Sequence, residues 1–155
     1  GKGLVGNMGS GRYLDYCVFG DVVNVSARIE ALTKRYGIGT LATRSFCDAL
    51  QNPPASRLLD EVYVVGKRDN TVELLELQPD SGGTPYADRF AELSQVYANA
   101  LQLYRRGSFN DAARAFAAVA ENFDDPVSRV MAQRSQDLAA APPEDWRGAY
   151  RFDKK

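Results

Sequence analysis

Two sets of side chains alternate along residues 13–19, with the period of two that is typical of a strand with distinct faces. Gly20 ends this alternation, and Asp21 is predicted to cap the helix that follows. Asn24 and Arg28 are four residues apart, so they lie together on one face of that helix. Beside them runs an apolar stripe at helical spacing, formed by Val22, Val25, Ile29 and Leu32.

The rest of the first 78 residues contains more predicted strands than helices. Residues 4–8 are expected to pair with 13–19 through a glycine-rich hairpin turn, and Gly37 is expected to end the first helix. The further expected elements are a strand at 38–43, a short helix at 44–50, and strands at 57–65 and 71–77 around a turn at 66–70.

Beyond residue 78 the pattern changes from strands to helices. Residues 79–85 have the composition of a Pro/Gly/Ser linker. Asp125 is placed to cap the last of the helices that follow, with Pro126 at its first position. We therefore predict two regions, 1–78 and 86–155, joined by the linker 79–85. The helical stripes of the second region lie at 86–104, 112–120 and 127–138.

Composition excludes several kinds of function. Nineteen Lys and Arg against twenty Asp and Glu give a net charge of -1, which disfavours binding to nucleic acid. No apolar run reaches the roughly 20 residues that span a bilayer, and no signal-peptide pattern opens the chain, so a cytoplasmic location is expected. The absence of histidine excludes a Ser-His or Cys-His nucleophile and a His-bound zinc. Cys17 and Cys47 have neither metal-site nor disulfide-scaffold spacing and are expected to be free thiols.

The pair formed by Asn24 and Arg28 suits phosphate chemistry. A guanidinium offers a planar fork of donors to phosphoryl oxygens, and a helix N-terminus favours anions. The alternative is that the two side chains form an ordinary solvated flank of the helix, which is the more common arrangement. The glycine-rich residues 1–11 contain no G-x-x-x-x-G-K-[ST] sequence, so a hairpin turn is favoured there over a phosphate-binding loop.

Residues 6–30 resemble a signature of the class III nucleotidyl cyclases, in the C-terminal half of their catalytic domain. That signature is G-x-x-G-S-x-x-R-x-x-Y-x-x-x-G-D-x-V-N-x-x-x-R-x-E. Arg12 lies close to the usual place of its first arginine. The other matching positions are Gly6, Gly9, Ser10, Tyr16, Gly20, Asp21, Val23, Asn24, Arg28 and Glu30.

The resemblance implies an enzyme that converts a nucleoside triphosphate to its 3′,5′-cyclic monophosphate and pyrophosphate. The family uses two divalent ions, Mg²⁺ or Mn²⁺, held by two aspartates in an F-x-D-[IVL]-x-G-[FY] segment and a G-D segment. Neither segment occurs in that context in residues 1–155, so the metal ligands are expected outside this chain. Asp21 belongs to a different Gly-Asp and is not a candidate ligand. By itself the chain is expected to be inactive.

The resemblance also assigns roles residue by residue. Asn24 would orient the ribose, and Arg28 would stabilise charge that develops on the phosphoryl oxygens. Lys67 falls at the position of a lysine that reaches the triphosphate. Cys17 falls at the position where the family selects its purine, and its context is similar to guanylyl cyclases, whereas the C-terminal region favours ATP; we expect ATP over GTP. Family sites form between two subunits, so a homodimer is implied.

The helical region resembles one tetratricopeptide unit followed by the P-P-x-D-W-x-G ending of many bacterial cyclases, here residues 142–148. One such repeat cannot bury its own apolar face, so it is expected to pack on the first region. Trp146 is predicted to be a packing anchor. The predicted fold is α+β, a partial ferredoxin-like cyclase sheet with a small helical tail. An inactive half-domain that binds a partner is the alternative, and a diguanylate cyclase is disfavoured because G-G-[DE]-E-F is absent.

Overall fold

Two antiparallel sheets and five helices form the part of the chain that a computed structural model describes, residues 2–11, 13–63, 71–78 and 85–152. None of the helices in these ranges has the length and apolar character that a membrane crossing requires. The elements in chain order are β1 (Leu4–Ser10), β2 (Tyr13–Phe19), α1 (Asp21–Tyr36), β3 (Leu41–Thr43), α2 (Arg44–Cys47), β4 (Ser56–Tyr63), β5 (Thr71–Leu77), α3 (Pro85–Arg105), α4 (Phe109–Phe123) and α5 (Pro126–Ala140).

The strands form two separate sheets. β1 and β2 make an antiparallel hairpin, as the sequence predicts, and the register runs from the pair Leu4 and Phe19 to the pair Ser10 and Tyr13. β1 is two residues longer than the predicted strand 4–8. The second sheet has the order β3-β5-β4 and is also antiparallel. Strands grouped before helices in one chain are typical of the α+β class, so the predicted fold class is confirmed.

Two elements are shorter than predicted. The strand expected at 38–43 is paired only over Leu41–Thr43, because Gly37 adopts a left-handed conformation and the Ile38 amide donates to the Thr33 carbonyl. That amide satisfies the end of α1 and does not join the ladder. The helix expected at 44–50 ends at Cys47 and continues only as single turns. The predicted turn at 66–70 lies outside the described residues.

The helical region forms three packed helices. α4 lies between α3 and α5 and packs against both. α5 begins as predicted: Pro126 is its first residue, and the Asp125 carboxylate accepts a hydrogen bond from the Ser128 amide at 2.9 Å. α3 starts at Pro85, at the last position of the predicted linker.

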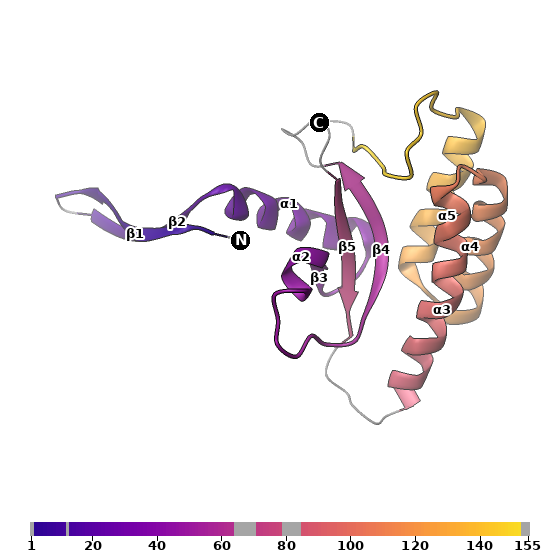
Figure 1. The fold of residues 1–155 in the computed structure, drawn as a ribbon, viewed down its shortest axis with the longest axis horizontal. Coiled ribbons are helices and arrows are strands. Elements are labelled where there is room, and N and C mark those ends of the chain that lie inside the picture. Colours follow the sequence, from indigo (N-terminus) through magenta and orange to yellow (C-terminus); the bar gives the residue numbers. More distant parts are fainter. Residues whose placement is uncertain (1, 12, 64–70, 79–84, 153–155) are drawn as a thin grey trace.

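One hydrophobic core joins the sheet to the helices. α3, α4 and α5 stand along one side of the three-stranded sheet, and the β1–β2 hairpin projects from the other side (Figure 1). Trp146 is a packing anchor, because its ring lies 5.1 Å from both Tyr104 and Phe109 and its Nε1 donates to the Tyr104 carbonyl. The fully buried members of the core come from both regions and include Tyr36, Leu59, Leu74, Tyr97, Tyr104, Phe116, Val127 and Met131.

A buried ion pair ties β4 to the start of α5. Arg57 donates to both oxygens of Asp125, at 2.6 and 3.2 Å, and to Glu76 at 2.6 Å. Burial raises the pKa of Asp125, but the hydrogen bonds and charge of Arg57 outweigh burial and hold that pKa below its usual value. The carboxylate therefore stays ionised in the folded protein.

This ion pair predicts a specific dependence of stability on pH. Because the folded pKa of Asp125 is lowered, its stabilisation is complete above the unfolded pKa of about 3.9 and is lost as the pH falls through the folded value. We expect Asp125→Asn to lower the free energy of unfolding by about 1.5–3 kcal/mol at pH 7. Urea unfolding should show a smaller difference in the free energy of unfolding between the unchanged protein and Asp125→Asn at pH 3 than at pH 7. The exposed Asp145 is the control, and Asp145→Asn should show no comparable change. A difference that grew on acidification would contradict the assignment.

Candidate functional site

The turn between β2 and α1 depends on Gly20. Its φ of 143° lies where side chains are rarely tolerated, and a Cβ there would be 3.2 Å from the Lys2 carbonyl oxygen. Gly20 is the N-cap residue and α1 begins at Asp21, so the prediction that Asp21 caps the helix is wrong. The sharp turn requires a glycine at the cap position, which moves Asp21 into the first turn, where its charge favours the helix dipole.

The candidate residues lie on one continuous strand, turn and helix. Asn24 and Arg28 are exposed on consecutive turns in the N-terminal half of α1 and share one face. Cys17 lies on β2, opposite Gly6 of the hairpin, and is a half-buried free thiol. The structure thus places these three on adjoining elements. Lys67, the fourth candidate, lies outside the described residues.

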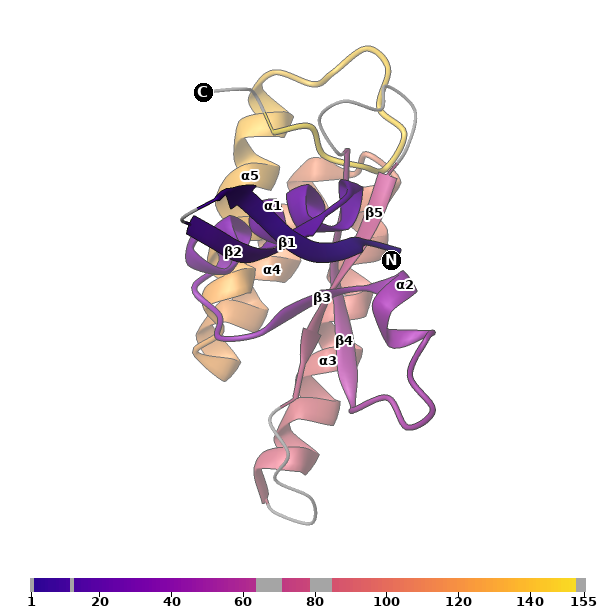
Figure 2. The same cartoon turned by 90° about the vertical axis from the view of Figure 1, so that its left-hand side faces the viewer.

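The hairpin that adjoins this face exposes large apolar side chains. Leu4 is 78%, Tyr13 is 82% and Tyr16 is 75% exposed. In Figure 2 the hairpin lies in front of α1 and of the three-stranded sheet. A lone two-stranded hairpin is marginally stable in water, and exposed apolar side chains are typical of an interaction surface. The hairpin therefore has the character of such a surface.

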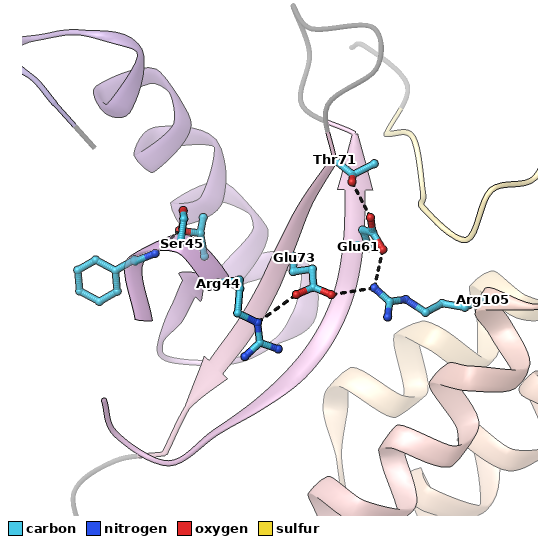
Figure 3. Close-up of polar contacts among 8 residues, drawn as sticks. Arg44, Ser45, Glu61, Thr71, Glu73 and Arg105 are labelled. Carbon is cyan, nitrogen blue, oxygen red and sulfur yellow. Dashed lines mark hydrogen bonds and ion pairs between the residues drawn. The ribbon is translucent and has the colours of Figure 1, made fainter. Parts of the chain in front are cut away.

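A series of polar contacts that the sequence did not reveal links α2, β4, β5 and α3 (Figure 3). Glu61 and Glu73 are opposite each other on β4 and β5. One nitrogen of Arg105 donates to both carboxylates, at 2.5 Å and 3.0 Å. Thr71 donates to Glu61 at 2.5 Å, and Arg44 donates to Glu73 at 3.0 Å.

These contacts hold the two strands to α3. Burial raises the pKa of Glu73, but the hydrogen bonds from Arg44 and Arg105 outweigh it, so the pKa is lowered and the group stays charged. Two guanidinium groups therefore face two carboxylates at the strand ends that flank residues 64–70. Arg105 lies 44 residues from Glu61 along the chain, and no local pattern could have paired them.

A second unpredicted cluster lies at the other end of α1. Tyr36, the last residue of α1, donates to a carboxylate oxygen of Asp60 on β4 at 2.6 Å. Arg134 of α5 donates to the same oxygen of Asp60 and, at 3.2 Å, to the Tyr36 hydroxyl. All three side chains are buried. The one sequence signal is a charged residue, Asp60, between the apolar Leu59 and Val62 of a predicted strand.

The described residues do not fit a divalent metal site. Among residues 2–11, 13–63, 71–78 and 85–152, no three His, Cys, Asp or Glu side chains gather closely enough to hold an ion. Asp15 on β2 and Asp21 on α1 belong to no such group within these ranges.

Comparison with known proteins gives a partial relationship. No family model matches the chain, and no solved structure matches it. The chain is 36% identical over 80 residues to an adenylate cyclase from Anabaena cylindrica. That match covers 50% of this chain and 16% of the cyclase, so the chain corresponds to a small part of its relative's length. The similarity to an adenylate cyclase thus spans 50% of this chain.

Proposed function

We propose that this chain is part of a nucleotidyl cyclase that forms a 3′,5′-cyclic nucleotide and pyrophosphate from a nucleoside triphosphate, with ATP preferred over GTP. In this reaction the ribose 3′ oxygen bonds to the α-phosphorus, the bond to the pyrophosphate oxygen breaks, and the hydroxyl proton is lost. The observation that carries the proposal is the 36% identity to an adenylate cyclase, together with the exposed pair Asn24 and Arg28 on α1.

The chemistry of α1 supports a role in the transition state. Negative charge develops on phosphoryl oxygens during transfer, and a guanidinium aimed at them lowers the barrier by about 3 kcal/mol. Arg28 supplies that group in this proposal, while the Asn24 amide orients the ribose. Both are exposed, so a substrate bound against this face of α1 can reach them. Lys67 is proposed to bind the triphosphate.

We further propose that the site is completed by a second copy of the protein. The hairpin next to α1 exposes large apolar side chains, and a homodimer interface would remove them from water. The Mg²⁺ or Mn²⁺ ligands of such an enzyme are proposed to lie outside residues 1–155. When bound, these ions would activate the attacking hydroxyl and neutralise the phosphates.

A second candidate is a half-domain that binds a partner and has no activity. Exposed aromatic side chains on the helical region would favour it. Among the described side chains of that region, the aromatic ones are all buried or half-buried, from Phe90 to Phe152. This distribution favours packing against the sheet, and the large exposed apolar side chains lie instead on residues 4–50.

The direct test is an assay of the full-length protein with ATP and with GTP in the presence of Mn²⁺. We expect cyclic AMP and pyrophosphate in equal amounts, with a higher kcat/KM for ATP. A protein that makes neither cyclic nucleotide, in a preparation shown to be folded and dimeric, would favour the partner-binding candidate.

Cys17 offers a test of substrate choice. If its side chain contacts the base, Cys17→Asp should change the ATP to GTP ratio of kcat/KM by about 5- to 150-fold, which corresponds to one pocket contact of about 1–3 kcal/mol. The rate with the better substrate should change less. Cys47, a buried free thiol at the end of α2, is the control, and Cys47→Ser should leave the ratio unchanged. An unchanged ratio in Cys17→Asp would remove Cys17 from the base pocket.

A further inference from the structure

The helix that carries Asn24 and Arg28 is fixed to the rest of the protein mainly at its far end. Tyr36, the last residue of α1, is the one fully buried side chain of this helix. The stripe residues Ile29 and Leu32 are half-buried against the core. The N-terminal half of α1 instead adjoins the exposed hairpin (Figure 1). The direction of α1 therefore depends strongly on how its C-terminal turn is held.

Three buried side chains from three elements hold that turn, and we call Tyr36, Asp60 and Arg134 the α1 anchor. The Tyr36 hydroxyl donates to Asp60 at 2.6 Å and accepts from Arg134 at 3.2 Å. Arg134 also donates to Asp60. Burial by itself lowers the pKa of Arg134, but the charge of Asp60 outweighs it and the pKa is raised well above its ordinary value. The pair therefore stays ionised inside the core, and both charges have partners.

The helical region surrounds this turn on further sides. A Cβ at Gly37 would lie 3.1 Å from the Pro126 side chain, so the end of α1 abuts the start of α5. The Arg35 guanidinium lies 4.5 Å from the centre of the Phe152 ring, and Arg134 lies 4.1 Å from that of Tyr150. α5 and the C-terminal segment thus fix the position of the last turn of α1.

Small rotations at this anchor become large displacements at the candidate site. Arg28 is eight residues before Tyr36, about 12 Å along the helix at a rise of 1.5 Å per residue. A tilt of about 5° at Tyr36 moves Arg28 by about 1 Å, and a displacement of that size can reduce a reaction rate by about a hundredfold. The anchor can therefore affect the position of Arg28 without touching it.

We infer that Tyr36, Asp60 and Arg134 are positioning residues, through which the helical region holds α1 in the orientation that Asn24 and Arg28 need for cyclisation. This inference rests on the proposed function for its effect on the rate. Its structural part, that the anchor orders α1, stands separately. α5 then supports the reaction through Arg134, which orients α1.

The chain offers closely matched controls for a test. Tyr36→Phe removes one buried hydroxyl, and Tyr97→Phe removes another, whose donor bond of 2.7 Å goes to the Leu59 carbonyl of β4. Arg134→Lys replaces the guanidinium of the anchor with an ammonium group. Arg57→Lys makes the same replacement in the other buried ion pair between sheet and helices. The two control variants remove the same chemical groups from positions that bond to β4, β5 and α5.

The experiment uses the full-length protein at a temperature at which circular dichroism shows all four variants to be folded. We expect Tyr36→Phe and Arg134→Lys to lower kcat by about tenfold or more with KM within about twofold, because a displaced group acts mainly in the transition state. Hydrogen exchange of the amides in α1 should accelerate in these two variants. Tyr97→Phe and Arg57→Lys should show neither change, even where they lower the melting temperature equally.

The inference is overturned if the control variants lose as much kcat as the anchor variants, or if exchange in α1 is unaltered in Tyr36→Phe. Should the unmodified protein form no cyclic nucleotide, the proposed function fails, and hydrogen exchange alone then decides whether the anchor orders α1. Arg134→Lys keeps a cation beside Asp60, so it provides a second variant if Tyr36→Phe does not fold.

Discussion

Replacing Arg28 with alanine is expected to lower kcat of the full-length protein by about a hundredfold or more while KM stays nearly constant. The reason is that a guanidinium on this exposed face of α1 contributes chiefly when negative charge has accumulated on the phosphoryl oxygens. Initial rates of cyclic AMP and pyrophosphate formation across a range of ATP concentrations would measure both constants. Asn24→Ala is expected to behave in the same way.

Lys34→Ala is the matched control for Arg28→Ala. Lys34 is an exposed cation on the same helix, and it pairs with Glu30 at 3.8 Å across one turn. An exposed pair of this kind contributes little to stability, so this variant should keep its activity. A loss in Arg28→Ala that appears only as a raised KM would make Arg28 a binder of the triphosphate. Equal rates in wild type and Arg28→Ala would show that Arg28 belongs to an ordinary solvated flank of α1. The activation free energy and the free energy of unfolding would then change by less than about 0.5 kcal/mol.

Replacing Phe116 with alanine is expected to lower the free energy of unfolding by about 3–5 kcal/mol, since the change leaves a cavity in the core. The Phe116 ring is fully buried on α4 and lies 5.2 Å from Tyr97 and 6.4 Å from Tyr104. For a chain of this size the melting temperature should fall by about 6–20 °C. Because the core joins both regions, the sheet and the helices should lose their structure together.

Two probes can test that joint transition. The fluorescence of Trp146 reports on the helices, and chemical labelling of the buried Cys47 reports on the sheet, in a Cys17→Ser background. Their midpoints should coincide and should fall together in Phe116→Ala. Phe46, which is exposed on α2, is the control. With either probe, Phe46→Ala should change the free energy of unfolding by no more than about 0.5 kcal/mol. Separate midpoints would mean that the helical region folds independently.

Local patterns predicted most of the secondary structure. The hairpin, α1, β5 and the three long helices lie where alternation and helical spacing place them. The cap of α5 was equally predictable, since Asp125 and Pro126 act within one turn. The shortened β3 was not, because whether the Ile38 amide joins a helix end or a strand depends on how Gly37 turns.

The sequence by itself determined the α+β class, the order of the elements, the shared face of Asn24 and Arg28 and the partial similarity to a cyclase, since all of these depend on residues close together in the chain. The tertiary structure alone decided which charged side chains are buried and what they hold. Arg134 meets Asp60 across 74 residues, and Arg57 meets Asp125 across 68. Such pairs form only when packing excludes water around them, because burial makes an unpaired charge so costly that each must find its partner in space.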